Sequence, residues 1–379
     1  MMIRIGFDAK RAFNNLRGLG SYSRNLIEGL TTLYPDNEYY LLGNKPKEPS
    51  CIHWLQNLEG KAKVISPKNG SGIGKALWRS AGMIKDIRHE KLDLYHGLSH
   101  EIPYFTSTVK SKFVVTIHDL IFLYYKDNFS IFDREIYLSK IKRSCHKSDK
   151  IIAISEQTKS DLINLLGIGS EKIEVIYQSC SPMFYERASE EKNKEVRNKL
   201  DLPDEYLLFV GALVEHKNVI NIIDSISILP EEFKIPLIIV GKGKEYKEEL
   251  IKRVKIKGLS EKVKFIDYVD NEDMPSLNQM AKLLIWPSLY EGFGIPIIES
   301  LFSGVPVLTS NLGVFREAAG KGGIYVNPAS IEEISDSIIN ILSDEELYKK
   351  LQKEGYQYVQ KFHIKNTTTK LMDLYQSVL

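Results

Sequence analysis

Residues 283–309 read LLIWPSLYEGFGIPIIESLFSGVPVLT, and the order of apolar and polar runs in this stretch decides the fold. The runs 283–286 and 305–309 have the length and composition of buried strands. Between them, Pro296 suits the first turn of a helix that we expect to end at Ser303. Apolar strands that are joined through a helix pair in parallel, so this stretch predicts an α/β fold.

The same alternation of apolar runs and helical stretches continues along the chain. The strands expected in the first half are 3–7, 92–95, 113–117, 150–154 and 175–177. Those expected in the second half are 207–210, 237–240, 263–266, 283–286, 305–309 and 324–326. The charged run 186–199 predicts a domain junction or a solvated helix between the halves. The 379 residues therefore suit two doubly wound domains facing a cleft, with ligands beyond the carboxyl ends of the strands.

Composition excludes several classes of protein. Hydrophobic residues make up 43% of the chain and the net charge is only +2, which gives no indication of nucleic-acid binding. Cys51, Cys145 and Cys180 form no CxxC pair, so neither a disulfide framework nor a zinc site is expected. The chain has no signal-peptide pattern, no run long enough to span a membrane and no D-x-D pair. We therefore expect a cytoplasmic protein without a metal or a cofactor.

Two glutamates bracket the expected start of the helix in the opening stretch. Glu299 lies in an apolar helical run, where an unpaired carboxylate would be costly, so some group has to donate a hydrogen bond to it. Glu291 lies in the preceding loop, and the amides of Phe293, Gly294 and Ile295 are expected at the helix start, where amides lack partners within the helix. Carboxylate acceptors and amide donors in one place suit a polyhydroxyl ligand such as a sugar or a ribose.

Two other strand-exit loops open helices. The stretch NNLRGLGS, residues 14–21, contains Gly20 and suits an anion at a helix start, although a simple turn explains it equally well. It is not a dinucleotide fingerprint, because Ser23 stands where a third glycine is needed. In GALVEHKN, residues 211–218, Asn218 suits the N-cap, and Lys217 beside it suits a phosphate. The alternative for Lys217 is an ordinary surface lysine.

Two further signals have a structural and a functional interpretation. His118 ends an expected strand, where it serves either as a polar group at the ligand or as a structural histidine with a hydrogen-bonded ring. The stretch GSGIGKA, residues 70–76, lacks the first glycine and the final Ser or Thr of a phosphate loop, so we reject that motif. The segment 61–91 carries eight basic residues against two acidic ones. It predicts either an amphipathic helix that docks on an anionic membrane or a core-packed helix with a solvated basic face.

With these residues in place, the sequence is similar to glycosyltransferases of family 4, which have the two-domain GT-B fold, and in particular to their bacterial mannosyltransferase-like members. The resemblance covers nearly the whole chain and is most specific in residues 287–311, where Glu291 and Glu299 form the family's E-x7-E motif. VVTIHDL at 114–120, IIAISEQTKSDL at 151–162 and the 211–218 loop follow in the family's order, and residues 7–22 resemble its acceptor loop. It implies an N-terminal acceptor-binding domain, 1–183 with a returning helix 362–379, and a C-terminal nucleotide-sugar-binding domain, 184–361.

The resemblance also implies roles for single residues. Lys217 and the amide of Gly20 would hold the donor diphosphate, and His118 would touch the sugar near the reacting carbon. Glu291 would contact the transferred sugar and Glu299 the ribose, with the amides of residues 293–295 assisting. The base would lie near Ile266, Tyr268 and Val269. Many relatives carry an arginine where Ala212 or His216 stands, so one positive charge on the diphosphate is missing or is supplied conditionally by His216.

The resulting expectation is a retaining, metal-independent hexosyltransferase of cell-surface polysaccharide synthesis. Its donor would be a nucleotide-diphosphate sugar, with GDP-mannose as the first candidate, and its acceptor a saccharide or a lipid-linked glycan. Since Glu291 and Glu299 have binding roles, no carboxylate is a compelling nucleophile, and front-face substitution is the expected mechanism. The alternatives are a nucleotide-sugar epimerase on the same fold and a non-catalytic sugar-nucleotide-binding subunit.

Overall fold

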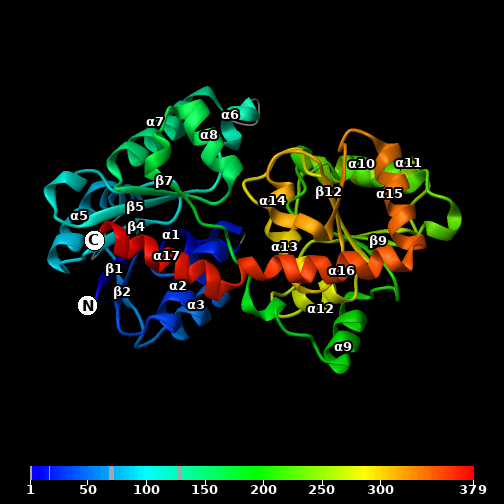
Figure 1. Ribbon diagram of the computed structural model, residues 1–379, viewed down its shortest axis with the longest axis horizontal. Coiled ribbons are helices and arrows are strands. Elements are labelled where there is room, and N and C mark those ends of the chain that lie inside the picture. The colour runs from blue at the N-terminus through cyan, green and yellow to red at the C-terminus, as the bar shows by residue number, and fades with distance from the viewer. Residues whose placement is uncertain (1, 17, 68–71, 127–129) are drawn as a thin grey trace. The chain divides into compact units, whose positions relative to one another are not determined.

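The computed structural model describes residues 2–16, 18–67, 72–126 and 130–379 (Figure 1). The chain divides into two compact units, Met1–Cys180 with His363–Leu379, and Ser181–Phe362. The expected domain boundaries were 183/184 and 361/362. Arg17, Lys68 and the first two residues of GSGIGKA lie outside the described residues.

The first unit is built on a seven-stranded sheet with the order β3-β2-β1-β4-β5-β6-β7, in which all pairs are parallel. Its strands are β1 Arg4–Asp8, β2 Glu38–Leu42, β3 Lys63–Ile65, β4 Leu94–Gly97, β5 Lys112–Ile117, β6 Lys150–Ala153 and β7 Ile173–Val175. Its α-helices are α1 Lys10–Asn14, α2 Gly18–Leu33, α3 Pro49–Gln56, α4 Gly72–Leu77, α5 Met83–His89, α6 Ile121–Tyr124, α7 Ile131–Lys147, α8 Glu156–Leu166 and α17 Ile364–Val378. A π-helical turn, Trp78–Gly82, joins α4 to α5, and short 3₁₀ turns are Thr106–Thr108 and Ser170–Lys172.

Two hydrophobic clusters cover the two faces of this sheet. Tyr39 and Leu41 pack on one side with α2 and α17, whereas Tyr40 and Leu42 pack on the other with α5, α7 and α8. Successive residues of a strand point to opposite faces, so β2 contributes to both clusters. The returning helix α17 lies close against α2, where a Cβ on Gly29 would come within 2.3 Å of Thr368 Oγ1.

The second unit is built on a six-stranded parallel sheet with the order β10-β9-β8-β11-β12-β13. Its strands are β8 Leu207–Val210, β9 Leu237–Val240, β10 Val263–Ile266, β11 Leu283–Trp286, β12 Val307–Ser310 and β13 Gly323–Val326. Its α-helices are α9 Glu190–Leu200, α10 Val219–Ser227, α11 Glu245–Ile256, α12 Met274–Gln279, α13 Ile295–Phe302, α14 Phe315–Ala319, α15 Ile331–Ser343 and α16 Glu345–Val359. Short 3₁₀ turns are Pro182–Phe184, Glu215–Lys217, Glu231–Phe233, Gly320–Gly322 and Gln360–Phe362.

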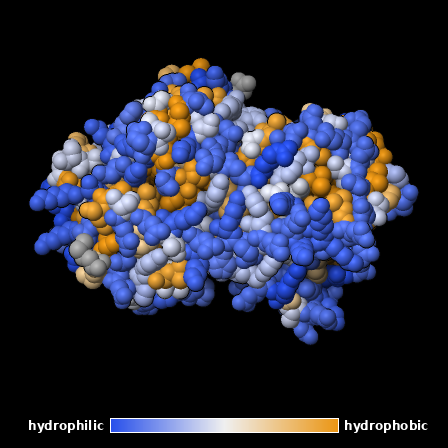
Figure 2. Space-filling model, viewed as in Figure 1, coloured by the Kyte–Doolittle hydropathy of each residue, from blue (hydrophilic) through white to orange (hydrophobic). Residues whose placement is uncertain are grey.

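The segment 61–91 is not the single amphipathic helix that its charge pattern suggested. It contains β3, α4, the π-helical turn and α5, and Ile84 and Ile87 of α5 are buried in the core. Arg79 is bound in ion pairs with carboxylates, so it is not part of a free basic face. The face seen in Figure 2 is mostly hydrophilic, with separate hydrophobic patches. Across 2–16, 18–67, 72–126 and 130–379, every helix is too short or too polar to cross a membrane.

Candidate functional site

The strand order of the second unit indicates where a ligand would bind, between β8 and β11. The chain moves outward from β8 to β9 and β10, then returns to the other side of β8 to form β11. Ligands of doubly wound sheets bind at such a reversal, beyond the carboxyl ends of the two strands. The loops that leave these ends are 211–218 after β8 and 287–294 after β11, which carry the residues expected at the donor.

Lys217 and Glu291 meet at this reversal, one from each loop. The Lys217 ammonium forms a hydrogen-bonded ion pair with Oε1 of Glu291, and both side chains are more than four-fifths buried. Lys217 Nζ also lies 4.6 Å from the centre of the Trp286 ring, at the end of β11. The indole is fixed in turn, because its Nε1 donates to the carbonyl of Val210 at 2.9 Å. The cation is therefore held at the reversal by a carboxylate and an aromatic face.

The loop after β11 turns into α13 through a conformation that requires glycine. Gly294 has φ = 115°, and a Cβ there would lie 3.1 Å from the Trp286 ring. Ile295 is the first residue of α13, and Pro296 follows in the first turn, as expected for a residue without a backbone N–H. Phe293 is buried, with its ring 5.2 Å from that of Phe362. The amides at a helix start have no partner within the helix and can serve an anion or a hydroxyl.

Glu299 lies one turn inside α13, and its half-buried side chain has no partner among the described residues. Among the residues that the structure describes, no hydrogen bond or ion pair reaches its side chain, although it lies between the buried residues Ile298 and Ser300. Burial raises the pKa of Glu299 to about 8, with no compensating charge or hydrogen bond. The group that was expected to donate to this carboxylate is thus absent from the described chain.

Asn218 corrects one expectation about the first loop. It stands directly before α10, but it has φ = 59° and its side chain accepts no capping hydrogen bond. Instead, its amide donates to the carbonyl oxygens of Pro287 at 3.1 Å and Pro328 at 2.7 Å. Asn218 therefore ties together three loops at the carboxyl edge of the sheet, which sequence reasoning missed.

The remaining expected donor residues lie on the same edge. Ile266 ends β10, and its carbonyl accepts from the amide of Gly241 at 2.9 Å. Tyr268 is 55% exposed, with Lys242 Nζ 5.5 Å from its ring centre, whereas Val269 is buried. An exposed aromatic ring beside a strand end can stack on a base.

His216, the other residue of the 211–218 loop expected at the diphosphate, links the two loops at the reversal. Its carbonyl accepts from the amide of Leu289 at 2.8 Å, which ties the loop after β8 to the loop after β11. Ala212, the second departure from the family's arginines, lies in the half-buried start of the same loop. Lys217 is thus the only Lys or Arg in residues 211–218.

Gly20 and His118 belong to the first unit. Gly20 lies in the first turn of α2 and is packed so tightly that a Cβ would come within 1.7 Å of the Asn15 carbonyl oxygen. Arg24 holds this loop in place, because it donates to the carbonyls of Asn15 and Ala12 at 2.8 and 3.0 Å. The glycine is therefore required by the approach of the loop, whatever it binds.

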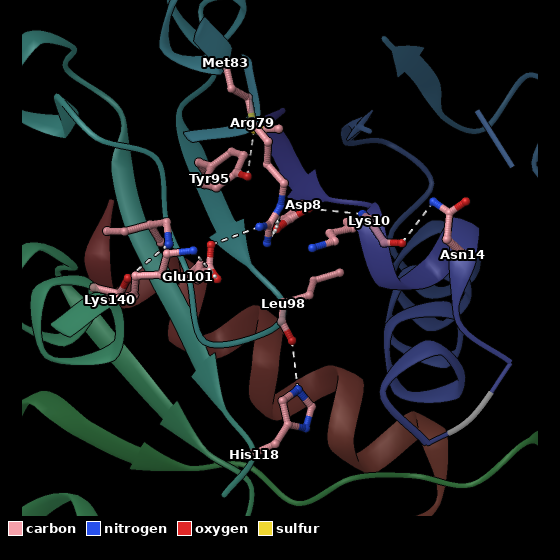
Figure 3. A network of polar contacts seen from close by, with 12 residues as sticks. Asp8, Lys10, Asn14, Arg79, Met83, Tyr95, Leu98, Glu101, His118 and Lys140 are labelled. Carbon is pink, nitrogen blue, oxygen red and sulfur yellow. Dashed lines mark hydrogen bonds and ion pairs between the residues drawn. The ribbon is translucent and has the colours of Figure 1, made fainter. Parts of the chain in front are cut away.

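His118 is a buried neutral histidine with both ring nitrogens engaged. Nε2 lies 2.9 Å from the carbonyl oxygen of Leu98, which can only accept, so Nε2 carries the proton (Figure 3). Nδ1 then accepts from the Gln178 amide at 3.2 Å, and the Tyr22 ring packs edge-on at 4.7 Å. Burial lowers the pKa of His118 to about 3. In this structure, contact between His118 and a sugar hydroxyl would require displacement of Gln178.

No group of three or more His, Cys, Asp or Glu side chains in the described parts of the chain is arranged to hold a metal ion. At the reversal in the second unit, the structure brings together carboxylates, a lysine and backbone amides. This set can bind a diphosphate and several hydroxyl groups at once.

Comparison with known proteins identifies the family. Residues 190–358 match the model described as glycosyl transferases group 1, and residues 16–180 match the model of glycosyltransferase family 4. The O-antigen chain mannosyltransferase B of Escherichia coli is 26% identical, over 95% of this chain and 96% of its own length. The serotype-specific mannosyltransferase WbdA of the same species is 29% identical over 72% of this chain, but that match covers only 34% of WbdA.

Solved structures agree on the fold. Anabaena HepE in complex with UDP-glucose superimposes with a TM-score of 0.77 at 18% identity, and the match covers all of both chains. Both units match glycosyltransferase models, and each has the doubly wound parallel sheet that this fold requires. The chain belongs to the glycosyltransferases of family 4, which have the GT-B fold.

Proposed function

We propose that this chain is a retaining glycosyltransferase that moves a hexose from a nucleotide-diphosphate sugar to a saccharide or lipid-linked glycan acceptor in cell-surface polysaccharide synthesis. The observation that carries the proposal is the half-buried carboxylate of Glu299, which has a raised pKa and no partner among the described residues. A ribose offers two adjacent hydroxyl donors, and a carboxylate has two oxygens to accept from them.

The other residues at the reversal complete a donor site. Lys217 would bind the diphosphate as a point charge, and Glu291, released from its ion pair, would accept from hydroxyls of the transferred sugar. The amides of Gly294 and Ile295 would donate to the same sugar or to the phosphate. Tyr268 would lie along the base. Each of these groups lies on a loop that leaves the same edge of one rigid sheet.

The relatives favour a mannosyl donor without fixing the base. The two E. coli relatives are named as mannosyltransferases, which supports GDP-mannose as the first candidate. HepE, whose structure was solved with UDP-glucose, shows that a neighbour of this fold takes a uridine nucleotide. The name of the first relative also supports a growing polysaccharide chain as the acceptor.

The mechanism that fits these residues is front-face substitution. The bond between the anomeric carbon and the diphosphate breaks, the acceptor oxygen attacks from the same face, and the leaving diphosphate takes the acceptor's proton. Lys217 would stabilise the charge that develops on the diphosphate, a contact worth on the order of 2–4 kcal/mol in comparable sites. His118, neutral and fully hydrogen-bonded, would shape the sugar pocket and would not act as a base.

Calorimetric titration of nucleotide sugars tests the donor site. GDP-mannose, UDP-glucose and UDP-N-acetylglucosamine are titrated into the wild type, into Glu299→Gln and into Glu261→Gln. Glu261 is an exposed glutamate just before β10, at the amino-terminal ends of the strands and therefore away from the proposed donor site. Its variant is the matched control. We expect one nucleotide family to bind the wild type and the control alike and to bind Glu299→Gln at least tenfold more weakly.

Transfer to an acceptor separates the proposal from its alternatives. Formation of a retained glycosidic bond with an acceptor glycan supports the transferase. Tight donor binding without transfer over a broad acceptor panel would instead favour a binding subunit, and an epimerised nucleotide sugar an epimerase. Absence of binding by all three donors would refute the proposed site.

A further inference from the structure

The first unit has a reversal of its own, with a different set of side chains. β1 pairs with β2 on one side and β4 on the other, so the strand order changes direction between β1 and β4. Asp8 ends β1, and Lys10 and Arg11 follow in α1. His100 and Glu101 lie in the loop after β4. None of these residues has a role in the donor site described above.

The ion pairs at this reversal involve two carboxylates, and more basic than acidic side chains lie around them. Arg79 donates to Asp8 through Nε at 3.1 Å and through Nη2 at 2.5 Å, and to Glu101 through Nη1 at 2.9 Å. Lys140 Nζ lies 3.5 Å from the other oxygen of Glu101 (Figure 3). Asp8 is thus already paired with Arg79, and Glu101 is shared between Arg79 and Lys140.

Lys10 and Arg11 add positive charge at this reversal, and Asp8 and Glu101 attract the Lys10 ammonium without forming an ion pair with it. No ion pair or side-chain hydrogen bond is present for either of them in the described chain, although the Lys10 side chain is directed toward Asp8 and Arg79 in Figure 3. The pKa of Lys10 is lowered, first by partial burial and then by the charges of Arg79 and Arg11. Four cations therefore surround two carboxylates at a strand-exit edge, and an added anion would relieve their repulsion.

His100 supplies a second, independent sign of a ligand. Its φ is 62°, an unfavourable conformation for a residue with a Cβ, and its amide is tied to the carbonyl of Thr116 at 2.9 Å. Its Nδ1 is buried and has no hydrogen-bond partner among the described residues. Burial, and then the charge of Arg11, lower the pKa of His100 to about 4, so the ring is neutral at pH 7 and keeps one N–H donor. A strained backbone and an unsatisfied ring nitrogen are typical of a site that a ligand completes.

We propose that Lys10, Arg11 and His100 bind an anionic group of the acceptor, either a phosphate or a carboxylate, at the β1/β4 reversal. The assignment to the acceptor rests on the proposed transferase function, because the donor residues other than Gly20 and His118 lie in the second unit. Binding of an anion at this place does not depend on that function. Lys10 and Arg11 supply the charge, and the His100 imidazole supplies a directed hydrogen bond.

An NMR titration of the full chain tests the site with three probes. Inorganic diphosphate, D-glucuronate and neutral D-glucose are added to protein that carries Lys217→Ala, so that the donor site does not take the diphosphate. The test variant adds Lys10→Gln and Arg11→Gln, and the control adds Lys45→Gln and Lys47→Gln, two exposed lysines of the same unit. His100→Asn is tested separately, because asparagine tolerates a positive φ and removes only the imidazole.

We expect the anions to bind the control background and to bind the Lys10/Arg11 variant at least about tenfold more weakly, as loss of charge-assisted hydrogen bonds predicts. His100→Asn should weaken them severalfold while its unfolding midpoint stays unchanged. Tighter binding of diphosphate identifies a phosphate as the source of the anion, and tighter binding of glucuronate identifies an acidic sugar. Equal binding by the Lys10/Arg11 variant, equal binding of glucose, or no anion binding at all would overturn the proposal. Failure of nucleotide-sugar binding in the wild type would refute the donor site alone and leave this titration interpretable.

Discussion

Donor affinity should depend on pH through Glu299. In the free protein, burial raises the pKa of this carboxyl from 4.5 to about 8. At about 1.4 kcal/mol per pKa unit, this shift means that ionising Glu299 costs about 5 kcal/mol more than ionising a solvent-exposed glutamate. At pH 7, one unit below the pKa, the remaining cost of ionising the group is about 1 kcal/mol.

The bound ribose can offset this cost. A hydrogen bond to a charged group contributes about 1.5–3 kcal/mol, so two ribose hydroxyls contribute about 3–6 kcal/mol. The sum favours the ionised, ribose-bound carboxylate by about 2–5 kcal/mol at pH 7. Glu299→Gln keeps the shape but loses the charge, so it should weaken donor binding roughly 30-fold or more.

The pH profile follows from the sign of this shift. Since the donor binds the ionised form, the wild type has to release a proton below pH 8. Its affinity should therefore rise by up to tenfold per pH unit from pH 6 to 8 and level off above pH 8. Glu299→Gln has no proton to release and should show a flat profile, whereas the Glu261→Gln control should follow the wild type.

Calorimetry at pH 6 to 9 with a nucleotide sugar measures this directly, because the diphosphate diester does not titrate in that range. Buffers of different ionisation heat report the proton count, which should be close to one released proton per donor at pH 7. A flat wild-type profile, or the same slope in Glu299→Gln, would refute the role of the buried carboxylate.

Three further predictions concern catalysis, metal and acid stability. Lys217→Ala should lower turnover roughly a hundredfold or more, because it removes the charge held beside Glu291 at the reversal, and near-normal single-turnover rates would contradict this. Transfer should be unchanged after treatment with a chelator, since in the proposed site Lys217 would supply the positive charge at the diphosphate; loss of activity that Mg²⁺ restores would show otherwise. The first unit should lose stability as pH falls from 6.5 toward 4, because burial lowers the pKa of His96 and His118 to about 3 and that of His100 to about 4, so the unfolded chain takes up protons first. The expected loss is up to about 4 kcal/mol per pH unit for the three rings together, and equal urea midpoints at pH 5 and 7 would contradict it.

Four of the six strands of the second unit could be predicted to the residue, whereas β2 and β3 of the first unit were not predicted at all. β8, β9, β10 and β11 have the expected bounds, because a strand buried on both faces is a continuous apolar run. β2 begins with a half-buried glutamate and two tyrosines, and β3 is a three-residue strand at the sheet edge that begins with an exposed lysine. Neither matches the continuous apolar run of a strand buried on both faces, so pairing with neighbouring strands decides their conformation.

The types of residue at the donor site could be predicted, but their contacts could not. Lys217 and Glu291 are 74 positions apart, and only the strand order brings them into one ion pair. Asn218 is a residue type that commonly caps helices. In the structure its side chain does not cap α10, and its amide donates to the carbonyls of Pro287 and Pro328. His100 gave no signal at all, because a left-handed backbone at a non-glycine residue is set by tertiary contacts.

Burial alone does not separate structural from functional polar residues in this protein. The presence or absence of hydrogen-bond partners within the described chain separates them better. His118 is buried and its ring is satisfied on both sides by Leu98 and Gln178, so the fold itself accounts for its neutral state. Glu299 is half-buried, its desolvation raises its pKa, and no group in the described chain is bonded to its carboxylate. A sequence can indicate that a carboxylate at this position needs a partner, but only the structure shows that the described chain does not provide one. A protein that retains such a cost in its free state gains from any ligand that removes it, and two adjacent hydroxyls are the smallest ligand that can.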